Sequence, residues 1–274
     1  MSSVPDAPPI VSAERAGMVA TVRWFSSRIW TFCVLELQKL SHDRTELLTR
    51  AIQPVLWLLI FGTTFSQFRA IPSGGVPYLD FLAPGILAQS TLFVSVFYGI
   101  QVIWERDAGI LSKLMATPTP RSAVVAGKSF AASIRAFVQA VVVVVVSLLL
   151  GVSFHLAPWR LAGVVVVVML GAAFFAALSM TLAGVVLKRE RVMGIGQAIT
   201  MPLFFASNAL YPIEFMPGWV QWLGRINPLT YEVNALRYLL LGTPTNLAVD
   251  IGVLVVAVIV GVTGASRVMP RLVR

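Results

Sequence analysis

Six long apolar stretches constrain the fold of this chain more than any other feature of its sequence. At a rise of about 1.5 Å per residue, each would form a helix of roughly 27–40 Å, enough to cross a hydrocarbon core of about 30 Å. Only 12% of the 274 residues are charged, which is about half the share that a soluble domain carries. The sequence therefore predicts an all-α polytopic membrane protein with six transmembrane helices, at about residues 51–68, 81–104, 129–151, 161–187, 192–210 and 247–265.

Lysine and arginine residues are distributed unevenly around these stretches. If the N-terminus is cytosolic, 17 of the 21 basic residues lie on the cytosolic side, as the positive-inside rule requires. The net charge of +9 then reflects orientation in a membrane and not a nucleic-acid partner. We therefore predict a multi-pass protein of the inner (cytoplasmic) membrane of a bacterial cell, with both termini in the cytosol.

The region before the first apolar stretch divides into two parts. Residues 1–17 contain prolines and charges but no apolar run typical of a signal peptide, so we expect a disordered cytosolic tail. Residues 18–50 carry apolar side chains at three- and four-residue steps, with tryptophans among them. This pattern predicts an amphipathic interfacial helix, or alternatively a helix packed against a soluble partner. Residues 51–274 then form the six-span domain.

The connection between the second and third stretches combines charge with an apolar face. Three charged residues end the second stretch, and apolar residues at helical spacing follow until Pro118 and Pro120. A solvated loop would explain the charges but not the apolar face, so we predict a short helix that docks a cytosolic protein. Its residues are Glu105, Arg106, Asp107, Ile110, Leu111, Lys113, Leu114 and Met115. Nearby, the GKS triplet at 127–129 lacks the earlier glycine of a phosphate-binding loop, because Ser122 occupies that position.

The segment between the fifth and sixth stretches is long, aromatic and interrupted by prolines. Two short helices fit it, at about 218–225 and 228–241, with Asn227 capping the second and Pro228 as its first residue. We predict an extracytoplasmic re-entrant hairpin that either closes the outer end of a pathway or only joins the outer ends of two spans. Its candidate residues are Glu214, Trp219, Trp222, Arg225, Asn227, Pro228, Tyr231, Glu232 and Arg237.

Charged side chains are almost absent from the stretches, since Arg135 and Asp250 lie near the ends of theirs, and the other polar side chains are uncharged. They either line a transport route or form hydrogen bonds between helices, and they are Gln89, Ser90, Ser95, Gln197, Thr200, Ser207 and Asn208. A proton-coupled transporter would need an acidic residue or a histidine in the middle of a span, and the sequence suggests none. With one cysteine and two distant histidines, no catalytic, metal or cofactor site is expected on this chain.

Residues 105–128 and 217–242, the latter with NPLTYEVNALRYLLLG at 227–242, resemble the permease subunits of ABC-2 type exporters, in the daunorubicin-resistance and polysaccharide or lipid-export branch. The resemblance implies two copies of a separate ATPase that carries ATP and Mg, and a second permease, identical or paralogous. It also implies that 105–115 is the coupling helix and 211–242 the outer gate. The exported cargo would be an amphipathic drug, a lipid or a lipid-linked glycan. The permease itself would be surrounded by membrane lipid. The alternative from the residues alone is an ion-coupled secondary transporter or channel subunit.

Overall fold

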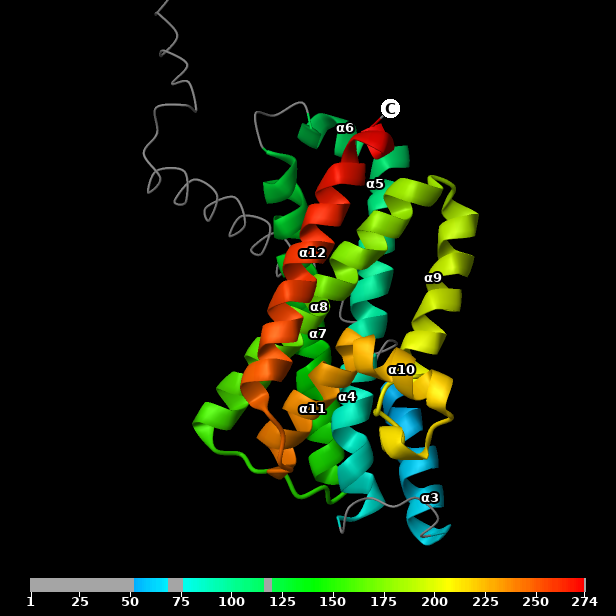
Figure 1. Cartoon of the computed structure of the whole chain (residues 1–274). Coiled ribbons are helices and arrows are strands. Elements are labelled where there is room, and N and C mark those ends of the chain that lie inside the picture. Colours follow the sequence, from blue (N-terminus) through cyan, green and yellow to red (C-terminus); the bar gives the residue numbers. More distant parts are fainter. Residues whose placement is uncertain (1–51, 69–75, 116–119, 274) are drawn as a thin grey trace, which may run out of the picture.

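The structure, a computed structural model, describes residues 52–68, 76–115 and 120–273 (Figure 1). Every regular element within these ranges is a helix, so the prediction of an all-helical chain is confirmed. The predicted tail (1–17) and interfacial helix (18–50) lie outside the described residues.

Four helices among the described residues are long and apolar enough to cross a membrane. The first is formed by α4 (Tyr78–Ile100) and its short continuation α5 (Val102–Asp107). The others are α7 (Arg121–Leu149), α8 (Pro158–Val186) and α12 (Leu247–Val273). They overlap the predicted second, third, fourth and sixth spans, as expected for a polytopic membrane protein.

The remaining two predicted spans are shorter helices. Residues 52–56 are helical and continue through a π-helical turn, η2 (Trp57–Gly62), into α3 (Thr63–Phe68). The helix α9 (Arg189–Phe205) has 17 residues, and a turn follows it at Ala206. The sequence therefore placed the end of this helix too late, since its apolar run continues to Leu210 although the helix does not.

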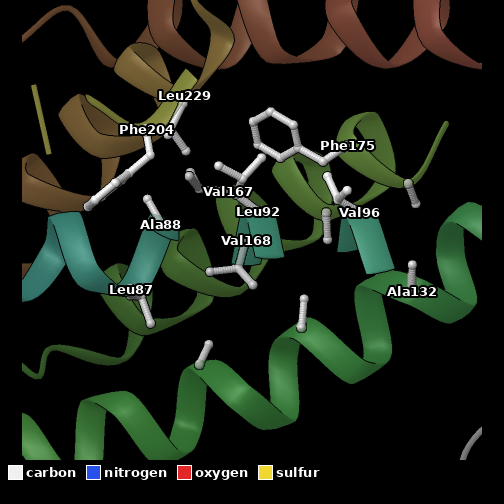
Figure 2. Packing of buried hydrophobic residues seen from close by; sticks show 14 of the residues in the cluster. Leu87, Ala88, Leu92, Val96, Ala132, Val167, Val168, Phe175, Phe204 and Leu229 are labelled. Atoms are coloured by element: carbon white, nitrogen blue, oxygen red, sulfur yellow. The ribbon is translucent and has the colours of Figure 1, made fainter. Parts of the chain in front are cut away.

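The central helix of the bundle is α4. In the α4–α5 span, 83% of the most apolar window is buried, against 22% in α12, so α4 lies inside the bundle while α12 keeps an exposed apolar face. Figure 2 shows Leu92 and Val96 of α4 beside Val167 and Phe175 of α8, with Leu229 of α11 on the same cluster. This core is made of small, branched and aromatic apolar side chains from sequentially distant helices.

The two ends of the bundle carry different elements. The helices α5 and α6 (Ile110–Met115) lie at the end where the C-terminus also lies (Figure 1). Two further helices, α10 (Gly218–Ile226) and α11 (Pro228–Leu241), lie beside the half of the bundle that is farther from that end. The predicted helices at 218–225 and 228–241 are thus confirmed to within one residue.

Candidate functional site

The candidate docking helix lies at the α5 end of the bundle. A sharp turn separates α5 from α6, and Gly109 adopts a positive φ of 69° there, which a residue with a Cβ rarely adopts. The predicted apolar part is a short helix, α6, whereas Glu105, Arg106 and Asp107 belong to α5, so the residues predicted as one docking helix are divided between two. The apolar face of α6 is only partly as predicted: Leu111 is fully buried, whereas Ile110 is 55% exposed. Ile110 points away from the bundle because the two residues are adjacent and cannot share one helical face.

Side-chain contacts tie α5 to three other helices. The Lys128 ammonium of α7 forms an ion pair with Glu105. Arg106 Nη1 donates a hydrogen bond of 2.8 Å to the carbonyl oxygen of Leu187, which ends α8. The guanidinium group of Arg189, the first residue of α9, lies 4.9 Å from the centroid of the Trp104 ring. A displacement of α5 would therefore be passed directly to α7, α8 and α9.

The contact between α5 and α8 involves a strained residue. Leu187 has a positive φ of 60°, which is an unfavourable conformation for a residue with a branched side chain. Its carbonyl oxygen is the one that accepts the hydrogen bond from Arg106.

The GKS triplet at 127–129 lies inside α7, with Gly127 and Ser129 buried. A helical interior leaves no loop of backbone N–H groups to cradle a phosphate. The triplet is therefore part of a helix and not of a phosphate-binding loop.

The predicted outer hairpin divides into an exposed part and a buried part. Trp219 and Trp222 of α10 are 71% and 63% exposed, and Glu214 and Arg225 are exposed as well. In contrast, α11 packs against α4, α8 and α12, and its Glu232 and Arg237 are buried. The Tyr231 hydroxyl donates to the Arg225 carbonyl oxygen (2.6 Å) and so connects the two parts.

Asn227 holds the junction between α10 and α11. Its Oδ1 accepts a hydrogen bond from the Leu229 N–H (3.0 Å), which confirms the predicted N-cap. Its Nδ2 also donates to the Leu203 carbonyl oxygen in the last turn of α9 (2.6 Å). Pro228 occupies the first helical turn, as predicted. One side chain therefore fixes the start of α11 and attaches it to α9.

Arg237 attaches α11 to α4 and to the turn after α9. Its Nη2 donates to the carbonyl oxygens of Asn208 (2.6 Å) and Ala209 (3.3 Å). The same turn lies against α4 at Gly85, where an added Cβ would be 2.1 Å from the Ala209 oxygen. Asn208 also donates from its side chain to Asn234 of α11. These contacts make α11 an integral part of the bundle.

Glu232 contradicts the expectation that no acidic side chain lies at the depth of the middle of a span. The residue is fully buried, and its carboxyl group lies against Gly171 of α8, where an added Cβ would be 2.3 Å from Oε2. Thr91 of α4 adjoins the same carboxyl group. Because Gly171 and Thr91 lie near the middle of their spans, an acidic side chain does reach mid-span depth. The sequence missed it because Glu232 is brought there by a short helix that is not itself a span.

The predicted polar set does not have one common environment. Three of its hydroxyl groups bond to carbonyls of their own chain segment three or four residues earlier, namely those of Ser90, Thr200 and Ser207. Gln197 is exposed. Ser95 is buried, and its hydroxyl has no hydrogen-bond partner among the described residues.

Two residues of the predicted set, Gln89 and Ser90, line the same cavity, and Gln53 and Gln139 also line it. Neither Gln53 nor Gln139 belongs to the set predicted from the sequence. A glutamine isolated within a valine-rich helix was the available signal for Gln139.

Comparisons with known proteins identify similar chains. The family model described as ABC-2 type transporter matches residues 27–241. The putative transport permease ycf38 of Cyanophora paradoxa is 30% identical over 200 residues, which cover 70% of this chain and 67% of that protein. The daunorubicin resistance ABC transporter permease protein DrrB1 of Streptomyces coeruleorubidus is 25% identical over 232 residues, covering 85% and 80%. The inner membrane transport permease YadH of Escherichia coli is 26% identical over 216 residues, covering 76% and 80%.

Proposed function

The chain belongs to the ABC-2 type transporter family, and from this premise we propose that it forms half of the membrane pathway of an ATP-driven exporter. A second permease, identical or paralogous, would complete the pathway. Two copies of a separate cytosolic subunit would bind ATP and Mg and hydrolyse the nucleotide, because this chain is a membrane component without a catalytic role of its own.

The contacts of α5 carry the proposed coupling to that ATPase. Glu105, Arg106 and Trp104 each contact a different neighbouring helix, while Ile110 of α6 is exposed at the same end. An exposed apolar residue at the end of a bundle, beside charged residues, suits a docking contact with a soluble subunit. A displacement of α6 by the ATPase would then be transmitted through α5 to α7, α8 and α9.

The proposed topology has six spans and two cytosolic termini. Residues 52–68 and α9 would be the first and fifth spans, although they are shorter than the other four. A tilted or locally thinned bilayer accommodates short helices at modest free-energy cost. The placement of 17 of 21 basic residues on the cytosolic side supports this orientation. It puts α6 and the α5 end of the bundle on the cytosolic side and α10 at the outer side.

We further propose that α10 and α11 form a re-entrant element with two roles. The buried α11 would join the spans, whereas the exposed tryptophans of α10 would lie at the outer membrane interface and restrict the exit. The observation that favours this division is the contrast in burial between Trp222 and Glu232.

The proposed cargo is an amphipathic drug, lipid or lipid-linked glycan. One similar permease is named for daunorubicin resistance, which makes daunorubicin a reasonable first test compound. The proposal as a whole is tested by copurification of the permease with an ATP-binding-cassette subunit and by measurement of ATP hydrolysis with and without the compound.

One observation favours a second candidate function. The buried carboxyl group of Glu232 beside the middle of α4 and α8 is the kind of group that ion-coupled transporters use. An ion-coupled secondary transporter or channel subunit is therefore kept as the alternative. Replacement of Glu232 distinguishes the two.

A further inference from the structure

A cavity of about 340 Å³ lies between the helix at residues 52–56, α4 and α7. Its volume falls in the range of about 300–1,000 Å³ that is common for small-molecule sites. The side chains that matter for its chemistry are Gln53, Gln89, Ser90, Phe93, Phe97 and Gln139. The cavity therefore combines amides and a hydroxyl with two phenyl rings.

Gln89 is the feature that points to a ligand. Its side chain is 2% exposed, and its Oε1 has no hydrogen-bond partner among the described residues. A buried amide oxygen without a donor is unfavourable, because it has lost its hydration without replacement. The oxygen has almost no accessible surface in this structure, so a rotation of the Gln89 side chain must first turn it toward the cavity, where a ligand that donates a hydrogen bond would satisfy it.

The lining also restricts the charge of that ligand. None of the described residues that line the cavity is ionisable, and an ionic group deep in a membrane protein needs a counter-charge. The Ser90 hydroxyl donates to the Leu87 carbonyl oxygen (2.7 Å), so only its acceptor capacity is left for a ligand. Phe97 is 38% exposed, and Gln53 is exposed as well, whereas the other lining residues are buried, so we infer that the cavity opens beside Phe97. The rings of Phe93 and Phe97 offer an apolar surface next to the amides.

We propose that this cavity binds the uncharged, hydroxyl-bearing part of an amphipathic ligand. A hydroxyl group of the ligand donates to Gln89 Oε1, and its apolar part packs against Phe93 and Phe97. This inference rests on the proposed export function and deepens it by naming the class of cargo. Phe97 lies close to the α5 end of α4, so in the proposed topology the cavity opens in the cytosolic half of the membrane.

The test uses the full chain in lipid nanodiscs and two photoreactive probes. The first is an alkyl glucoside with a diazirine in its alkyl chain, and the second carries a phosphate in place of the glucose. After irradiation, peptide mass spectrometry locates the crosslinks. We expect the glucoside to label residues 89–97 or 139, and excess unmodified alkyl glucoside to suppress that labelling. The phosphate probe should label these residues several-fold less.

Two variants and a matched control separate binding from misfolding. Gln89→Leu removes the amide oxygen and should lower saturable labelling roughly three- to tenfold, the loss expected for one hydrogen bond. Phe97→Trp enlarges a half-exposed side chain at the opening, so it should lower labelling without disturbing the buried amides. Gln221→Leu makes the same chemical change on α10, distant from the cavity, and should label like the unmodified protein.

Several outcomes would overturn the proposal. Labelling that excess glucoside does not suppress, or that both probes produce equally, would show nonspecific contact with a lipid-like chain. Unchanged labelling in both Gln89→Leu and Phe97→Trp would show that the cavity holds only water or lipid. These readouts do not depend on ATP. Recovery of an ATPase partner without saturable labelling would therefore remove the cavity assignment alone, whereas labelling without an ATPase partner would count against the proposed function.

Discussion

The guanidinium group of Arg237 lies 3.7 Å from the centroid of the Phe81 ring, and its Nε donates to the Phe81 carbonyl oxygen at 3.3 Å. These contacts join α11 to the first turn of α4, although the two residues are far apart in the sequence. The same guanidinium group holds the turn after α9 through two further carbonyl oxygens. Arg237 therefore connects three segments at one point of the bundle.

Arg237→Met should destabilise the whole bundle. The change leaves three buried carbonyl oxygens without a charged donor, which we expect to cost about 2–4 kcal/mol. The thermal midpoint of the purified protein in detergent should fall by roughly 5–10 °C. Arg225→Met on the exposed α10 is the matched control and should shift it little. Equal midpoints for the two variants would refute the role of Arg237.

The two functions of Asn227 can be separated by two substitutions. Asn227→Asp keeps the oxygen that caps α11 but loses the donor to Leu203, whereas Asn227→Ala loses both. The cap alone is worth about 1 kcal/mol, too little to unfold the bundle but enough to change a two-state element several-fold. If α10 and α11 gate the exit, Asn227→Ala should assemble normally and loosen the dependence of ATP hydrolysis on cargo.

The control for the gate is Trp222→Asp. If Asn227→Ala transports normally and Trp222→Asp merely prevents expression, then α10 and α11 are a structural connection and the gate proposal is wrong. If both variants assemble and both alter transport, the gate proposal stands.

Helix α11 shows what could be predicted from sequence. Its limits followed from local chemistry, because Asn227 and Pro228 mark a helix start and Gly242 a helix end. The depth at which α11 lies in the bundle could not be predicted from its own sequence. It depends on Gly171 of α8, which leaves room for the Glu232 carboxyl group. A close approach between distant helices has no signature in the sequence of either one.

Helix α6 shows that the sequence also did not predict which side of a short helix is buried. Spacing correctly predicted a short helix after Gly109, yet it grouped Ile110 with Leu111, and the structure exposes the first and buries the second. The cavity beside Gln89 was also beyond prediction. Gln53, Gln89 and Gln139 come from three helices, and only their packing brings them together.

Glu232→Gln should distinguish ATP-driven export from ion coupling. The substitution nearly preserves shape and removes an ionisable group from the bundle interior, where ionic groups are unfavourable. In inside-out vesicles that contain the assembled transporter, daunorubicin uptake driven by ATP should continue in the variant. An imposed pH gradient without ATP should drive no more uptake in either protein than in vesicles that lack the transporter, into which the weak base daunorubicin itself distributes. Gradient-driven uptake that Glu232→Gln abolishes would support the ion-coupled alternative instead.

The topology predicts which positions face each side of the membrane. In a Cys33→Ser background, a cysteine at Ser153, in the exposed connection between α7 and α8, should react with an impermeant maleimide in intact cells. A cysteine at Ser112, exposed on α6, should react only after permeabilisation. Labelling of position 112 in intact cells would show that the α5 end is not cytosolic.

The most direct test of the central claim is quantitative copurification from native membranes, comparing the unmodified chain with Ile110→Asp. An added carboxylate on this exposed apolar residue should break docking without disturbing the core, so membrane levels should be unchanged. Ile226→Asp, the same change on exposed α10, is the control. We predict that the unmodified chain and Ile226→Asp retain an ATP-binding-cassette subunit and its ATP hydrolysis, and that Ile110→Asp loses both. Recovery of no such subunit with the unmodified chain, or equal recovery with Ile110→Asp, would contradict the account.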